Sequence, residues 1–180
     1  MHMTLWADPS CNRGAIEGVE VEVERPRTSL LRLRYAIVGD IAQLVVPPPS
    51  PAPVRTHGLW ESTCVELFLR GEGENNYLEF NFSPSGDWAA FAFSRYRHGM
   101  VQAELPAPPD IETEPSADRL IIDIAVSPYI DDRPYLMNVA AITQGPAGER
   151  AFWSGFHPDH GPDFHHPSCF IDQLPPAPRP

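Results

Sequence analysis

The sequence contains no lysine, because all 13 of its basic residues are arginine. Chemistry that needs a lysine amine, such as Schiff-base formation or the phosphate-binding lysine of a P-loop, is therefore excluded. Cysteine is scarce as well, and Cys11, Cys64 and Cys169 lie far apart with no C-x-x-C pair among them. Their number and spacing argue against a structural zinc site and indicate buried free thiols.

Long hydrophobic runs and clusters of positive charge are also missing. No apolar run approaches the ~20 residues that a membrane span requires. Residues 1–10 have neither the basic start nor the apolar stretch of a secretory signal, so we expect a cytoplasmic protein. The formal net charge is −11, and no run of basic residues offsets it. Such a field repels nucleic acids and anionic membranes, which we exclude as partners.

The chain has 180 residues, of which 42% are hydrophobic, and this suits one well-cored domain. Its 22 prolines and 12 glycines interrupt it so often that no long segment keeps a helical period. Apolar and polar residues alternate instead in many short segments, which is typical of an antiparallel sandwich or barrel. We predict one all-β domain over residues 1–174, followed by a frayed proline-rich tail over 175–180.

The expected strands cover 18–24, 30–38, 41–46, 63–70, 76–83, 87–96, 120–127, 135–143 and 150–155. In the first two, valine or leucine alternates with glutamate or arginine, and a short turn separates them. This pattern predicts an antiparallel hairpin in which glutamates face arginines across the strands.

Side chains of the three central strands alternate between two faces of a sheet. We expect Ser83 to pair with Trp88 across a tight turn at Gly86, where glycine suits the unusual backbone angles. This register places two polar residues opposite two alanines, namely Asn81 opposite Ala90 and Glu79 opposite Ala92.

The face that carries these polar residues is predicted to be a shallow binding surface. The two alanines form its floor, and its other groups are Glu66, Glu79, Asn81, Phe68 and Trp88. Flat aromatic rings beside carboxylates and an amide suit a polyhydroxylated ring, whose C–H face stacks while its hydroxyls form hydrogen bonds. The alternative is that this face packs under the proline-rich loops, with its glutamates paired to Arg32 or Arg34.

Three segments carry a resemblance to a known family: RTHGLWESTCVELFLR (55–70), YLEFNFSPSGDWAAFAFSRYRHGM (77–100) and FWSGFHPDHGPDFHHPSCFIDQL (152–174). They resemble the bacterial DOMON-like domain proteins, which are similar to family 9 carbohydrate-binding modules and to haem- and sugar-binding DOMON domains. The resemblance implies an immunoglobulin-like β-sandwich of roughly ten strands, with a ligand cleft on one sheet face. Sugar-binding relatives place a terminal sugar between two tryptophans, for which Trp60, Trp88 and Trp153 are the candidates.

Together these observations predict a non-enzymatic domain that binds a small polar ligand, in particular a carbohydrate, without a cofactor. The expected contacts are Glu66, Glu79, Asn81 and Trp88 at the centre, with Trp60, Phe68 and Arg95 at the rim. The alternative is a protein–protein interaction or homodimerisation module that uses the same face.

Residues 157–166 contain four histidines and two aspartates, which are ligand types suited to zinc or iron. Prolines make this segment an extended loop, so we expect no metal site and instead a loop anchored by His165 or His166 through hydrogen bonds to the backbone. No methionine–histidine pair matches the haem ligands of DOMON relatives. Glu66 and Glu79 could flank a glycosidic bond, but a shallow sheet face excludes water too poorly to raise the pKa of an acid catalyst.

Overall fold

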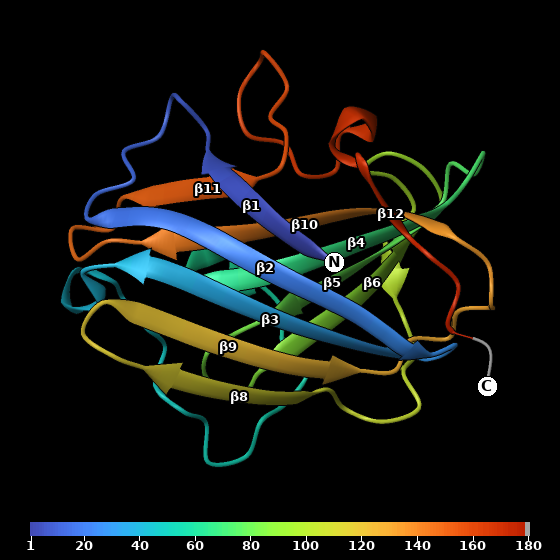
Figure 1. Ribbon diagram of the computed structural model, residues 1–180, viewed down its shortest axis with the longest axis horizontal. Coiled ribbons are helices and arrows are strands. Elements are labelled where there is room, and N and C mark those ends of the chain that lie inside the picture. The colour runs from blue at the N-terminus through green and yellow to red at the C-terminus, as the bar shows by residue number, and fades with distance from the viewer. Residues whose placement is uncertain (179–180) are drawn as a thin grey trace.

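Antiparallel strands make up nearly all the regular structure in the computed structural model, which describes residues 1–178 (Figure 1). In chain order the strands are β1 (His2–Ala7), β2 (Ile16–Arg27), β3 (Leu30–Gly39), β4 (Cys64–Gly71), β5 (Tyr77–Phe82), β6 (Trp88–Phe93), β7 (Val101–Gln102), β8 (Asp110–Pro115), β9 (Arg119–Val126), β10 (Tyr135–Gln144), β11 (Arg150–Ser154) and β12 (Asp172–Leu174). Three short 3₁₀ helices, η1 (Ile41–Gln43), η2 (Leu59–Glu61) and η3 (Pro167–Cys169), lie in the loops. Across residues 1–178, no helix is long and apolar enough to span a membrane.

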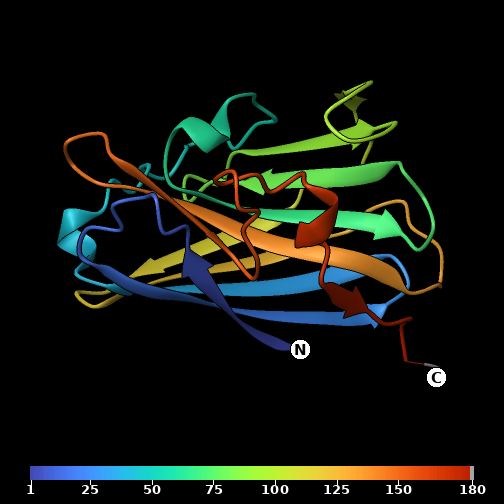
Figure 2. The ribbon, with the colours of Figure 1, turned by 90° about the horizontal axis from the view of Figure 1, so that it is seen from above.

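The strands form one continuous sheet in the order β7-β6-β5-β4-β10-β11-β1-β2-β3-β9-β8, with β12 paired to β10. The sheet curls so that the half containing β4–β6 lies over the half containing β2, β3 and β9 (Figure 2). The predicted antiparallel all-β class is confirmed. The predicted immunoglobulin-like sandwich is not, because β1 pairs with both β11 and β2 and so joins the two halves into a half-barrel.

The core lies between the two halves of the curled sheet. Its apolar side chains come from alternate positions of each strand, for example Val19, Val21 and Val23 of β2 and Val65, Leu67 and Leu69 of β4. The glutamates of β2 point outward, and Glu22 lies opposite Arg34 and Glu24 opposite Arg32. The predicted hairpin is therefore confirmed. Because side chains of a strand alternate between its two faces, the valines of β2 lie on the buried face and its glutamates on the exposed one.

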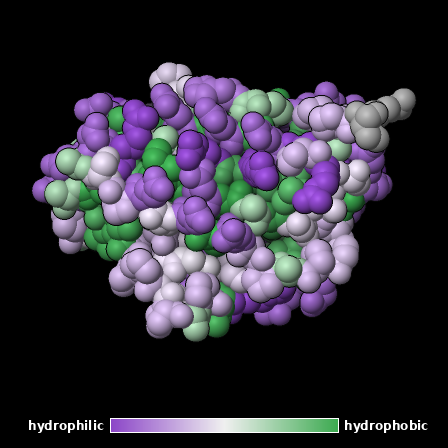
Figure 3. Space-filling model, turned by 60° about the horizontal axis from the view of Figure 1, so that its bottom comes forward, coloured by the Kyte–Doolittle hydropathy of each residue, from purple (hydrophilic) through white to green (hydrophobic). Residues whose placement is uncertain are grey.

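Charged side chains cover the outer face of the β2–β3–β9 half. The guanidinium of Arg34 pairs with the carboxylate of Asp123 on β9, at 2.7 Å. The alternative expectation that Arg34 pairs with Glu66 on β4 or Glu79 on β5 is therefore wrong. On the face shown in Figure 3, hydrophilic and hydrophobic side chains are mixed.

One buried hydrogen bond ties the two halves together across the core. The hydroxyl of Tyr35, on β3, donates to the backbone carbonyl of Glu66, on β4, at 2.7 Å, and Tyr35 is fully buried. We expect Tyr35→Phe to lower the free energy of unfolding by about 1 kcal/mol, because it removes this bond and little volume. Urea denaturation measures the change. Tyr129→Phe is the control, since Tyr129 is exposed and should lose nothing measurable.

Two further predictions concern loops. The expected strand over 41–46 is wrong, because η1 occupies Ile41–Gln43 and the Asp40 carboxylate accepts the Ala42 amide at 3.1 Å, as a helix N-cap does. In the expected tail over 175–180, the Pro175 carbonyl accepts a hydrogen bond from Arg25, and the Ala177 amide donates to Asp132. Residues 179–180 lie outside the described residues.

Candidate functional site

The hairpin between β5 and β6 has a register one residue away from the predicted one. Phe82 lies opposite Trp88, so Glu79 faces Phe91. The physical reason is the turn: the Ser83 amide donates to the Asp87 carbonyl at 2.9 Å, and Gly86 adopts a φ of +92° within a three-residue loop. The predicted pairing of Ser83 with Trp88 is therefore wrong.

This shift moves every side chain of β6 to the face opposite the predicted one. Trp88 lies on the core side, with the Arg55 guanidinium 4.4 Å from its ring centre. Ala90 packs in the same core, so the predicted alanine floor is wrong. Phe91 and Phe93 lie on the outer face instead, beside Glu79.

A cleft of about 500 Å³ lies on this outer face. The loop around η2 and the loop between β11 and η3 both contribute to it. Rings supply most of its wall, namely His57, Trp60, Phe91, Phe93, Phe152, Phe164 and His165. Its polar lining comes from Glu66, Glu79 and Arg97. Its volume lies within the range of roughly 300–1,000 Å³ typical of small-ligand sites.

Two carboxyl groups lie at the bottom of the cleft. Glu66 is 3% exposed and Glu79 is 5% exposed. Burial, reinforced by the nearby charge of Glu79, raises the pKa of Glu66 well above its usual value. Burial also raises the pKa of Glu79, although a hydrogen bond from the Asn81 amide at 2.7 Å and the charge of Arg97 oppose the rise. The cleft thus places two poorly solvated carboxyls near each other. The expectation that this face excludes water too poorly to raise the pKa of a carboxyl is wrong, because the loops over the sheet bury both groups.

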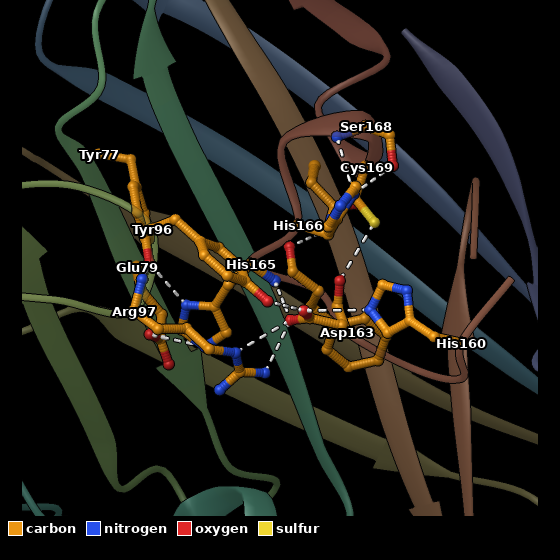
Figure 4. Close-up of polar contacts among 12 residues, drawn as sticks. Tyr77, Glu79, Tyr96, Arg97, His160, Asp163, His165, His166, Ser168 and Cys169 are labelled. Atoms are coloured by element: carbon orange, nitrogen blue, oxygen red, sulfur yellow. Dashed lines mark hydrogen bonds and ion pairs between the residues drawn. The ribbon is translucent and has the colours of Figure 1, made fainter. Parts of the chain in front are cut away.

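A chain of polar contacts links one carboxyl to the loop before η3 (Figure 4). Burial raises the pKa of Tyr77 to about 12, so its hydroxyl stays protonated, and it shares a hydrogen bond with Nδ1 of His165 at 2.8 Å. Nε2 of His165 lies 3.7 Å from the Glu79 carboxylate. Burial, helped by the charge of Arg97, lowers the pKa of His165 to about 4, so the imidazole is neutral near pH 7.

Arg97 stands at the edge of the cleft in a left-handed backbone conformation, with φ +51°. Its amide donates to the Tyr77 hydroxyl at 3.1 Å, and its guanidinium pairs with Asp163 at 2.7 Å. Burial acts to raise the pKa of Asp163, but the hydrogen bonds from Tyr96 and Arg97 outweigh it, and the pKa falls below its usual value. These bonds compensate for a conformation that a non-glycine residue rarely adopts.

The histidine-rich loop is attached to the body by contacts of several kinds. His157 Nε2 lies 2.8 Å from the Trp6 carbonyl, and His166 accepts the Ser168 amide at the start of η3. His166 therefore forms the predicted bond to a backbone group, although within its own loop, whereas His165 bonds to the Tyr77 side chain. Within residues 1–178, no three histidine, cysteine, aspartate or glutamate side chains converge as metal ligands would.

Of the seven predicted contacts, the cleft brings together three: Trp60, Glu66 and Glu79. Asn81 and Phe68 lie beneath the cleft floor and are fully buried, and Trp88 lies on the opposite face. Arg95 is exposed and does not line the cleft. Its place is taken by Arg97, which the sequence pattern did not single out.

The two-tryptophan arrangement does not form in the described residues. Trp153, like Trp88, is buried in the core, where its indole N–H donates to Thr143 at 2.9 Å. Trp60 therefore faces phenylalanine and histidine rings in the cleft. Phe152 and Phe164 were missed by sequence reasoning, although the run of aromatic residues from 152 to 165 is a usable signal.

No protein-family model matches the chain, and no curated protein matches its sequence. Among solved structures, a candidate carbohydrate-binding protein from Bacteroides uniformis aligns with a TM-score of 0.61 at 15% identity, over 94% of this chain and 83% of its own. A family 9 carbohydrate-binding module from Caldicellulosiruptor kristjanssonii, in complex with cellotriose, gives a TM-score of 0.53 at 10% identity, over 87% and 73%. These alignments show a shared fold, so the expected likeness to family 9 modules is confirmed at that level.

Proposed function

We propose that this protein is a non-enzymatic binding protein whose cleft takes a carbohydrate. The observation that carries the proposal is the cleft itself, in which aromatic rings form the wall and two carboxyls form the floor. Rings can stack on the C–H face of a sugar, while carboxyl oxygens accept hydrogen bonds from its hydroxyls. The fold shared with carbohydrate-binding proteins supports this assignment.

The properties of the carboxyls favour binding over glycoside hydrolysis. A glycosidase separates the roles of its two carboxyls, so that one is protonated and the other ionised. Here burial raises the pKa of both Glu66 and Glu79, and no arginine is paired with either one within residues 1–178. Incubation with chromogenic glycosides should release no chromophore.

A protein–protein interface on the same face fits the structure less well. The two carboxyls are more than nine-tenths buried at the bottom of a recess, where a flat partner surface would not reach them. A small ligand can enter the recess, so the cleft favours it. Size-exclusion mass tests the rival directly, because a dimer that Glu66→Ala disrupts would favour the interface.

Binding is tested by isothermal titration with glucose, cellotriose and a panel of other sugars, together with tryptophan fluorescence. We expect saturable binding and weakening of about fivefold in Trp60→Ala, because stacking on one ring is worth about 1 kcal/mol. Trp6→Ala is the matched control, since Trp6 is exposed and does not line the cleft. Absence of heat and of a fluorescence change with every sugar would contradict the proposal.

A further inference from the structure

The floor of the cleft has many hydrogen-bond acceptors and few donors. Among residues 1–178, the Glu66 carboxyl accepts a hydrogen bond only from the thiol of Cys64, 3.7 Å from Oε1. The Glu79 carboxyl accepts one from the Asn81 amide N–H, but Oδ1 of Asn81 is buried and has no hydrogen-bond partner in this part of the chain. Because Asn81 lies opposite Glu66 across β4 and β5, these acceptors are neighbours. A ligand that reaches the carboxyls of Glu66 and Glu79 on this floor has to bring donors, whereas Asn81 lies beneath the floor and out of its reach.

Among residues 1–178, no arginine forms an ion pair with either carboxyl of this floor, although the charge of Arg97 acts on both from a greater distance. Arg97 is the arginine that lines the cleft, and its guanidinium is engaged by Asp163 through two hydrogen bonds of 3.2 and 2.7 Å. His165 lies near Glu79 but is neutral near pH 7. Among residues 1–178, Glu66 forms no ion pair. A cation would therefore meet two carboxyls with no competing partner.

The wall of the cleft suits a cation as well as a sugar ring. His57 lies 4.6 Å from Trp60 and 5.7 Å from Phe91, measured between ring centres, so three rings gather on one side. Phe152 and Phe164, 6.0 Å apart, contribute further rings. The faces of such rings attract cations, and the attraction is stronger where water is displaced.

The geometry points to a ligand that carries a protonated amine, an amino sugar being the form that fits the proposed function on which this inference rests. An alkylammonium group has three N–H donors and one positive charge, which match the acceptors of Glu66 and Glu79. Its sugar ring would lie against Trp60 and the neighbouring rings. An ammonium group beside Glu66 would also offset the burial and repulsion that raise the pKa of this carboxyl.

Isothermal titration near pH 7 with D-glucosamine, D-glucose and N-acetyl-D-glucosamine tests the inference. We expect glucosamine to bind at least about tenfold more tightly than the other two, because only glucosamine carries the positive charge. Cyclohexylamine, which has the amine without hydroxyls, distinguishes a sugar site from a general amine site. Weak binding of cyclohexylamine beside tight binding of glucosamine would support both the inference and the proposed function.

Two variants test whether Glu66 and Glu79 cause the preference for glucosamine over glucose. Glu66→Gln and Glu79→Gln keep the shape of the side chain and remove its charge, so each should reduce the preference for glucosamine over glucose by about tenfold. Glu24→Gln, on the exposed face of β2, is the matched control and should leave the preference intact. Far-ultraviolet circular dichroism verifies that all three variants are folded.

The outcomes separate the two proposals. Equal affinity for glucose and glucosamine would overturn the amine inference and leave carbohydrate binding in place. Equally tight binding of cyclohexylamine and glucosamine, with no binding of glucose, would support the amine site and overturn the carbohydrate assignment. No binding of any of the four compounds would overturn the amine inference, and the carbohydrate assignment would fall with it only if cellotriose and the rest of the sugar panel also failed to bind.

Discussion

Phe68→Ala is expected to lower the free energy of unfolding by about 3–5 kcal/mol, the cost typical of emptying a phenylalanine site in a core. Phe68 is fully buried although it points to the outer face of β4. The rings of His165 and Phe170 lie 5.2 and 6.3 Å from its ring centre, so it fastens the loop before β12 to the sheet. Urea denaturation followed by circular dichroism measures the loss.

The sequence had suggested that Phe68 lies at the rim of the binding face. The unfolding experiment distinguishes that role from the packing role that the structure gives it. Phe156→Ala is the control, because Phe156 is 42% exposed and its loss should cost about 0.5 kcal/mol or less. If Phe68→Ala lowered the free energy of unfolding no more than Phe156→Ala does, the result would contradict the packing of the loop on β4. The cleft wall formed by Phe164 and His165 would then lose its support as well.

Glu66→Gln is expected to raise the free energy of unfolding by about 1–3 kcal/mol near pH 8, because it removes a buried carboxyl that has little hydrogen bonding. The gain should depend on pH in a definite direction. The folded-state pKa of Glu66 lies above its usual value of 4.5, so the folded chain binds more protons than the unfolded chain above that pH. The contribution of Glu66 to the free energy of unfolding is therefore fully present below about pH 4.5, and it is lost as the pH rises through the folded-state pKa.

The difference between the variant and the natural protein should consequently be near zero at about pH 4 and grow toward pH 8. His165 has the opposite effect, because its pKa is lowered to about 4 and stability is lost as the pH falls below its usual value of 6.5. It is present in both proteins, so the difference isolates Glu66. Glu24→Gln should show no such trend. A destabilised Glu66→Gln near pH 8 would mean that the ionised carboxylate has a stabilising partner.

A group that lowers stability and yet lies in a cleft is a recurring feature of binding sites. Strain and poorly solvated charge persist there because the ligand, once bound, compensates for them. Glu66 fits this pattern in the free protein, where the thiol of Cys64 donates to its carboxyl at 3.7 Å. The proposed ammonium group would bring the hydrogen-bond donors and the positive charge that the Glu66 carboxyl lacks in the free protein.

The sequence by itself determined most of the segments that become strands and, in β2, β3 and β4, which side chains face the core. The valines of β2 and the alternation in β3 predict the hairpin and its ladder of Glu22 opposite Arg34, because side chains of a strand alternate with a period of two. Polar, short or irregular strands gave a weaker signal, and β1, β7, β8 and β12 were missed. Glu66 and Glu79 were found because carboxylates inside apolar strands stand out.

Only the tertiary structure decided which of these residues share a site. A turn one residue shorter than expected reversed the faces of β6 and exchanged Trp88 for Phe91, since a shift of one residue inverts every side chain. The curling of one sheet through β1 likewise depends on pairing between distant strands. Arg97, Phe164 and His165 come from loops, whose path is set by contacts such as Arg97 with Asp163 rather than by local periodicity.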